Sequence, residues 1–172
     1  EILHEINPAL EALAYLGSRA NGHTLDRLEE RFLLHPALAL EQSRQVTDAM
    51  AQRAMDNLLR AMDLVHKFSD KGCRAVEDAE NAIDRYEDRL GTYLVKLSSR
   101  ELSDSDSHAV SKLLHCIGDF ERISDHSVNI LEVAEEMREK KISFSSQANA
   151  ELKVLFSALK EILNLATEAF AE

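Results

Sequence analysis

The chain has 172 residues, a formal net charge of −11, five Gly, two Pro, 45% hydrophobic and 30% charged residues. This length suits one compact domain, and the scarcity of turn residues with no period-two alternation predicts helices and no sheet. The acidic charge argues against a nucleic-acid partner, because phosphate backbones are bound by clustered Lys and Arg. No stretch approaches the roughly 20 apolar residues of a membrane span, and no signal peptide is visible, so a soluble chain is expected.

The N-terminal part, residues 1–35, is predicted to form short helices and a linker. Asn7-Pro8 has the pattern of an N-cap followed by the first helical residue. Thr24 is a candidate cap for a second short helix, which ends before His35-Pro36 because the residue before a proline avoids the helical region. We therefore expect residues 36–172 to form the main helical bundle.

Four amphipathic segments follow, with apolar residues at three- and four-residue steps. The Lys71-Gly72 pair is expected to end the first helix, and serine-rich turns are expected to cap the third and fourth. Long helices joined by short polar turns predict an all-α, antiparallel up-down helical bundle. The apolar stripes run from Leu40 to Phe68, from Val76 to Leu97, from Val110 to Met137 and from Leu152 to Phe170.

Two acidic pairs are candidate metal ligands. Glu121 and Asp125 stand four residues apart on the third helix, and Glu80 and Asp84 form a matching pair on the second, with Asp88 a turn further on. If these helices are neighbours, the pairs face each other and offer hard oxygen ligands to a divalent or trivalent metal. The spacing alone leaves open the alternative that the acidic rows are a solvated face.

Catalytic machinery is not apparent, so an enzyme is not expected. The chain has no nucleophile elbow, Gly-rich phosphate loop or H-E-x-x-H motif. Asp63-x-x-His66 has the spacing of di-iron bundles, but that chemistry needs two such pairs, and the other one is Glu1-x-x-His4. A ferritin-like di-metal enzyme and a metal-free helical interaction scaffold are retained as alternatives to a regulatory metal-binding domain.

The third helix carries the most specific motif. Residues 120–130 read F-E-R-I-S-D-H-S-V-N-I, which resembles the PhoU family signature of an aliphatic residue followed by E-R-I-G-D-H-x-x-N-I. Phe120 replaces the usual Leu, and Ser124 replaces Gly. Residues 80–84 resemble the family's E-x-x-x-D element, so that residues 40–139 resemble one three-helix PhoU repeat and the fourth helix resembles the start of another.

The resemblance implies a regulatory role in phosphate uptake and bound metal ions, with Fe, Mn, Zn or Ni as candidates. The implied metal ligands are Glu80, Asp84, Glu121 and Asp125, and no other cofactor is expected. Residues 28–42 also resemble the join between the membrane part and the cytoplasmic PhoU-like tail of bacterial sodium/phosphate cotransporters. The expected partner is therefore a phosphate transporter membrane domain or a sensor protein.

The expected location is the cytoplasm, at the inner face of the membrane if the chain is part of a transporter. The resemblance leaves open whether the chain is such a tail or a free-standing regulator. The unpaired fourth helix favours a homodimer.

Overall fold

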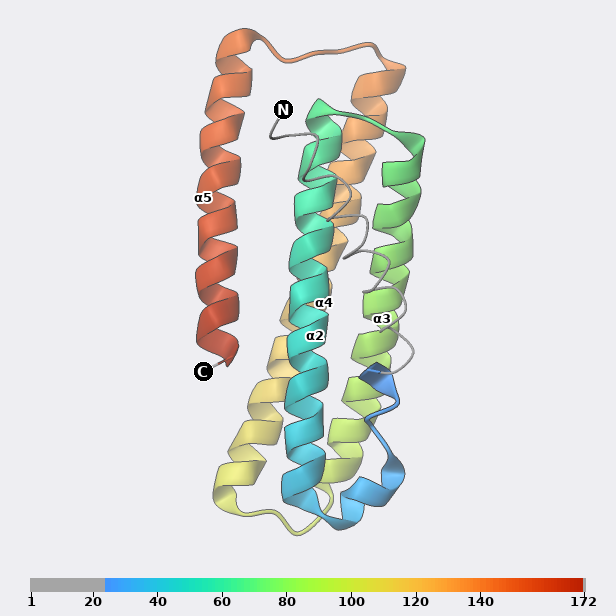
Figure 1. Cartoon of the computed structure of the whole chain (residues 1–172), viewed down its shortest axis with the longest axis vertical. Coiled ribbons are helices and arrows are strands. Elements are labelled where there is room, and N and C mark those ends of the chain that lie inside the picture. The colour runs from blue at the N-terminus through green and yellow to red at the C-terminus, as the bar shows by residue number, and fades with distance from the viewer. Residues whose placement is uncertain (1–23, 172) are drawn as a thin grey trace, which may run out of the picture.

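The computed structural model describes residues 24–171. These residues form a short 3-10 helix and four long α-helices, and no strand occurs among them, which confirms the predicted all-α bundle. The long helices alternate in direction, so that α2 and α4 run parallel to each other and antiparallel to α3 and α5 (Figure 1). The elements are η1 (Glu30–Leu34), α2 (Pro36–His66), α3 (Asp70–Ser98), α4 (Asp104–Glu139) and α5 (Ser146–Ala171).

The N-terminal region differs in part from its prediction. Of the regular helix expected from Thr24 to Leu33, only Thr24 and Leu25 are α-helical; a turn at residues 26 and 27 follows, and then the 3-10 helix η1. The helix expected after Asn7-Pro8 lies outside the described residues. Pro36 is the first residue of α2, as predicted. Proline is tolerated there because the amide of the first helical residue has no partner within the helix.

The turn between α2 and α3 is tighter than predicted. Lys71-Gly72 does not end α2 but lies in the first turn of α3, where Ser69 Oγ accepts a hydrogen bond from the Gly72 amide at 3.1 Å. A Cβ atom at Gly72 would lie 2.5 Å from Leu64 Cδ2 and 2.8 Å from Ser69 Oγ. The glycine is therefore needed for the close approach of two helices and not as a helix stop.

The serine caps of the later helices are confirmed. Ser103 Oγ accepts a hydrogen bond from the Asp106 amide at 3.1 Å, and Ser145 Oγ accepts one from the Ala148 amide at 3.2 Å. Each cap pairs an amide that has no partner within its own helix.

The core between α2, α3 and α4 is divided into two apolar clusters. The larger cluster occupies the lower half of the bundle in Figure 1. The smaller cluster includes Ala61, Leu64, Val76 and Leu131. In sequence, Asn57 on α2 and Ser124 on α4 fall between the positions that supply the two clusters, and they are 0% and 1% exposed. We call this pair the polar layer. The larger cluster includes Leu40, Val46, Met50, Ala54, Ile83, Tyr86, Leu90, Leu94, Leu97, Val110, Leu113 and Ile117.

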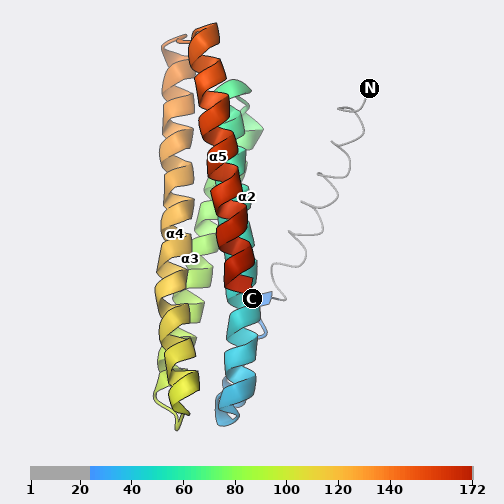
Figure 2. The same ribbon diagram turned by 90° about the vertical axis from the view of Figure 1, so that its left-hand side faces the viewer.

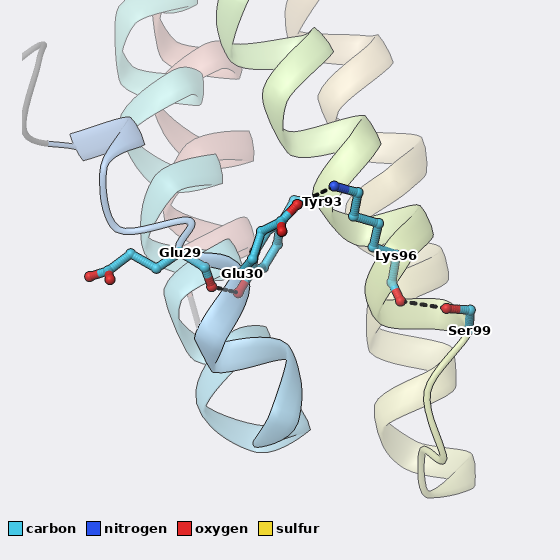
Figure 3. A network of polar contacts seen from close by, with 5 residues as sticks. All are labelled: Glu29, Glu30, Tyr93, Lys96 and Ser99. Atoms are coloured by element: carbon cyan, nitrogen blue, oxygen red, sulfur yellow. Dashed lines mark hydrogen bonds and ion pairs between the residues drawn. The ribbon is translucent and has the colours of Figure 1, made fainter.

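Residues 24–35 form a strap that lies against both α2 and α3 (Figure 3). Leu28 and Leu33 are buried in the larger cluster. Tyr93 donates a hydrogen bond to the Glu29 carbonyl oxygen at 3.1 Å, and Lys96 forms an ion pair with Glu30. Burial and the nearby Glu29 carboxylate raise the pKa of Tyr93, which keeps its hydroxyl available as a donor.

Helix α5 lies along α2 (Figure 2). It also has an exposed apolar side of its own. Its inner side contacts the bundle through Phe156 beside His66 and Phe170 beside Phe120, with ring centroids 5.9 and 5.2 Å apart. No residue from 146 to 170 is fully buried, so α5 leaves much of its apolar surface exposed. No described helix is long and apolar enough to span a membrane. The exposed apolar residues of α5 are Val154, Leu155, Ile162 and Leu165.

Two glycine-to-alanine substitutions should change stability in opposite directions. Gly72→Ala should lower the free energy of unfolding by about 1–3 kcal/mol, because its methyl group overlaps Leu64 and disturbs the Ser69 cap. Gly118→Ala on α4 should raise it by about 1 kcal/mol, since a Cβ there meets nothing within 4 Å and alanine favours the helix. Urea unfolding of both variants measures the difference, and an unchanged or higher free energy of unfolding for Gly72→Ala would contradict the packing described for Gly72.

Candidate metal centre

The four predicted ligands lie on the two helices that pack as antiparallel neighbours, α3 and α4 (Figure 1). Glu80 is repelled by Asp84 on its own helix and by Asp125 across the seam between α3 and α4, which we call the groove. Glu121 is repelled by Asp125 on its own helix and by Asp84 across the groove. A step of four residues along α3 thus corresponds to a step of four residues back along α4, as a level antiparallel pair requires. The structure therefore brings the two acidic pairs to the same level of one groove.

The environment of this groove favours the neutral form of its half-buried glutamates. Burial raises the pKa of Glu80, and the Asp84 and Asp125 carboxylates raise it further. Burial is also the largest cause that raises the pKa of Glu121, followed by repulsion from Asp125, Glu87 and Asp84 and by a hydrogen bond with Asp125. Negative charge in the groove is therefore costly to the folded protein.

Protein cations do not relieve this repulsion in the described part of the chain. Between residues 24 and 171, none of the four carboxylates forms an ion pair. Arg122 follows Glu121 directly, but it pairs with Asp119 at 3.4 Å. Because like charges four residues apart destabilise a helix, protonation or a cation from solution would relieve the repulsion in the groove.

The third acidic residue of the α3 row is Glu87 and not Asp88. The Glu87 carboxylate repels Glu121 and raises its pKa. Asp88 instead lines a separate pocket of about 520 Å³ beside the strap and Lys96. A straight helix face follows steps of four and then three residues, so position 87 stays in line with positions 80 and 84 while position 88 turns away. This period is the signal by which the sequence could have identified Glu87.

The groove fits a cation in charge and in ligand type, but its side chains are not gathered around one point. Within residues 24–171, no three Asp, Glu, His or Cys side chains come close enough together to hold a metal ion. The donors are all carboxylate oxygens, which suit hard cations such as Mn²⁺ better than metals that prefer nitrogen or sulfur. These residues would hold an ion only after their side chains turn towards each other.

The second motif considered for metal is not assembled into a larger site. Asp63 and His66 lie exposed at the end of α2, where the His66 ring packs edge-on against Phe156. The Glu1-x-x-His4 pair lies outside the described residues. The arrangement seen here thus offers no support for a ferritin-like centre.

Neutralising Glu121 should stabilise the metal-free protein. Because its pKa is raised by folding, the ionised form costs stability at neutral pH, and this cost is lost as the pH falls through the raised pKa towards the ordinary value of 4.5. Glu121→Gln should therefore add about 0.5 kcal/mol near pH 7 and almost nothing near pH 4.5. Urea unfolding at several pH values measures this, with exposed Glu139→Gln as the control. A gain that grows towards low pH would contradict the repulsion.

Comparison with known protein families matches residues 47–134 to the PhoU domain. The match includes most of α2 and α4, all of α3 and the four predicted ligands. Comparisons with curated proteins and with solved structures found no match. Because the matched region is more than half of the chain and folds as the three-helix unit described above, the chain belongs to the PhoU domain family.

Proposed function

We propose that this chain is a regulatory domain for phosphate transport and that a cation bound between α3 and α4 is part of its regulation. Membership of the PhoU domain family supports a role in phosphate homeostasis. The single observation that supports the cation is the mutual repulsion of Glu80, Asp84, Glu121 and Asp125 in a groove where none of them has an ion-pair partner among residues 24–171.

The ligands come from two helices, so a bound cation would connect α3 to α4. Glu80 and Asp84 would supply oxygen atoms from one side, and Glu121 and Asp125 from the other. The ion would supply positive charge that neutralises the groove and would favour the folded arrangement by mass action. Among Fe, Mn, Zn and Ni, the oxygen-only donor set favours Mn²⁺ or ferric iron.

The partner in this proposal is the membrane domain of a phosphate transporter or a sensor protein, at the cytoplasmic face of the membrane. The strap supports it, because residues 28–42 resemble the join of a cotransporter to its cytoplasmic tail. The strap is attached to α3 through Tyr93 and Lys96, and α3 also carries Glu80 and Asp84. A change at the cation site would therefore act on the helix that holds the strap. The exposed apolar side of α5 is the surface for the homodimer in this proposal.

Addition of Mn²⁺ should raise the melting temperature of the chelator-treated protein. At a free concentration about 100 times the Kd, binding to the folded state alone adds about 2.7 kcal/mol, or roughly 5–10 °C for a domain of this size. The double variant Glu121→Gln/Asp125→Asn should lose this shift. The control is Glu101→Gln/Glu139→Gln, which removes two exposed charges away from the groove and should keep it. Differential scanning calorimetry and elemental analysis of protein purified without chelator measure both effects.

A metal-free interaction scaffold is the second candidate function. It is favoured by the observation that no three ligands are gathered around one point in residues 24–171. Equal melting temperatures with and without Mn²⁺, together with no bound metal after purification, would support the scaffold and contradict the cation proposal.

A further inference from the structure

One side chain in the core connects all three helices of the PhoU unit. Asn57 on α2 is 0% exposed. Its Nδ2 atom donates a hydrogen bond to the Val76 carbonyl oxygen on α3 at 3.2 Å and another to Ser124 Oγ on α4 at 3.4 Å. Its Oδ1 atom has no hydrogen-bond partner among the described residues. An apolar side chain of similar size would avoid this unpaired atom, so stability alone does not explain the asparagine.

Both partners of Asn57 stand next to the predicted ligands. In an α-helix the carbonyl of residue 76 is also the acceptor for the amide of residue 80, so Asn57 is attached to the turn that carries Glu80. Ser124 lies three residues after Glu121 and directly before Asp125. The two hydrogen bonds of one carboxamide therefore fix the α3 row and the α4 row relative to a single point on α2.

The apolar packing around the polar layer is less able than a directed hydrogen bond to stop the helices from sliding along their axes. Hydrophobic burial is non-directional, and small side chains give helix surfaces few projections that resist sliding. A slip of one residue moves a helix by about 1.5 Å, which is large against the roughly 0.2 Å tolerance of metal-ligand distances. A buried asparagine is the best-known device for fixing register between packed helices. Small buried residues near the polar layer are Ala54, Ala61, Ser127 and Ala134.

We propose that Asn57 is a positioning residue that sets the register of α3 against α4, so that Glu80 and Asp84 stay level with Asp125 and Glu121. The inference rests on the proposed cation function. It is specific to a chain with a hydroxyl at position 124, because the glycine of the family signature has no side chain to accept the hydrogen bond.

Asn57→Leu separates positioning from stability. This variant removes the unpaired Oδ1 atom and should unfold at an unchanged or higher temperature, but Mn²⁺ should bind about 10- to 100-fold more weakly, as is typical when support of metal ligands is lost. Ser124→Ala should weaken Mn²⁺ binding in the same direction. The double variant should bind no more weakly than Asn57→Leu alone, because both changes remove one shared interaction. Isothermal titration with Mn²⁺ alone measures these affinities.

Thr47→Val is the matched control. Thr47 is also 0% exposed on α2, but its hydroxyl donates only to the Ser43 carbonyl of the same helix, at 2.8 Å. Among the described residues, the hydrogen bond that this variant loses lies within α2 and does not reach α3 or α4. It should bind Mn²⁺ as the unchanged protein does.

A metal-free measurement distinguishes failure of this inference from failure of the cation proposal. Spin labels at positions 85 and 122, which are exposed on α3 and α4, report the distance between these helices in a Cys73→Ala/Cys116→Ala background. Asn57→Leu should shift or broaden the distance distribution without any metal, and Thr47→Val should not. If the unchanged protein binds no Mn²⁺ but the distribution still broadens, the register role stands and the cation role fails.

Identical distance distributions for Asn57→Leu and the unchanged protein would overturn the register proposal, whatever the Mn²⁺ affinity. Should Asn57→Leu fail to fold, Ser124→Ala decides by the same two measurements, because it leaves the asparagine and its hydrogen bond to Val76 in place. Unchanged distances and unchanged affinity in Ser124→Ala would then reject a role for the bond between the two side chains.

Discussion

The structure depends on a balance between apolar packing and charge repulsion across the α3–α4 groove. Apolar clusters at both ends of the three-helix unit hold the helices together. Between these ends, Glu80 and Glu121 lie half-buried in the groove beside Asp84 and Asp125, and ionisation of the two glutamates is unfavourable. Packing is strong enough to keep the carboxylates close, yet none of them is neutralised by a cationic side chain in residues 24–171. That combination is the physical basis of the proposed response to cations.

The polar layer of Asn57 and Ser124 lies at the level of the acidic pairs. Asn57 and Ser124 interrupt the apolar core beside the turns that carry the acidic pairs. The strap is attached to the far half of α3, so the same helix carries the proposed ligands in one half and the contacts with the strap in the other. A shift of α3 would therefore move both Glu80 and Asp84 and the contacts of Tyr93 and Lys96 with the strap. In the proposed function, this arrangement would connect a bound ion to the strap through α3.

The sequence was a good guide where one helix determines the outcome. The apolar stripes and the serine caps follow from helical periodicity and from local cap chemistry. It was a poor guide where two helices meet. Gly72 looked like a helix stop because its contact with Leu64 is tertiary, and Asp88 was preferred to Glu87 because four-residue steps drift around a helix. The bridging role of Asn57 depends on α3 and α4 together and has no signature in α2.

Anomalous X-ray diffraction from crystals grown with Mn²⁺ tests the central claim most directly, because it locates the ion without any assumption about its ligands. The account predicts a peak between α3 and α4, with carboxylate oxygens of Glu80, Asp84, Glu121 and Asp125 about 2.1–2.3 Å away, typical of such bonds. A groove without a peak, while the protein is saturated with Mn²⁺ in solution, would contradict it. So would an ion bound only by residues elsewhere on the molecule.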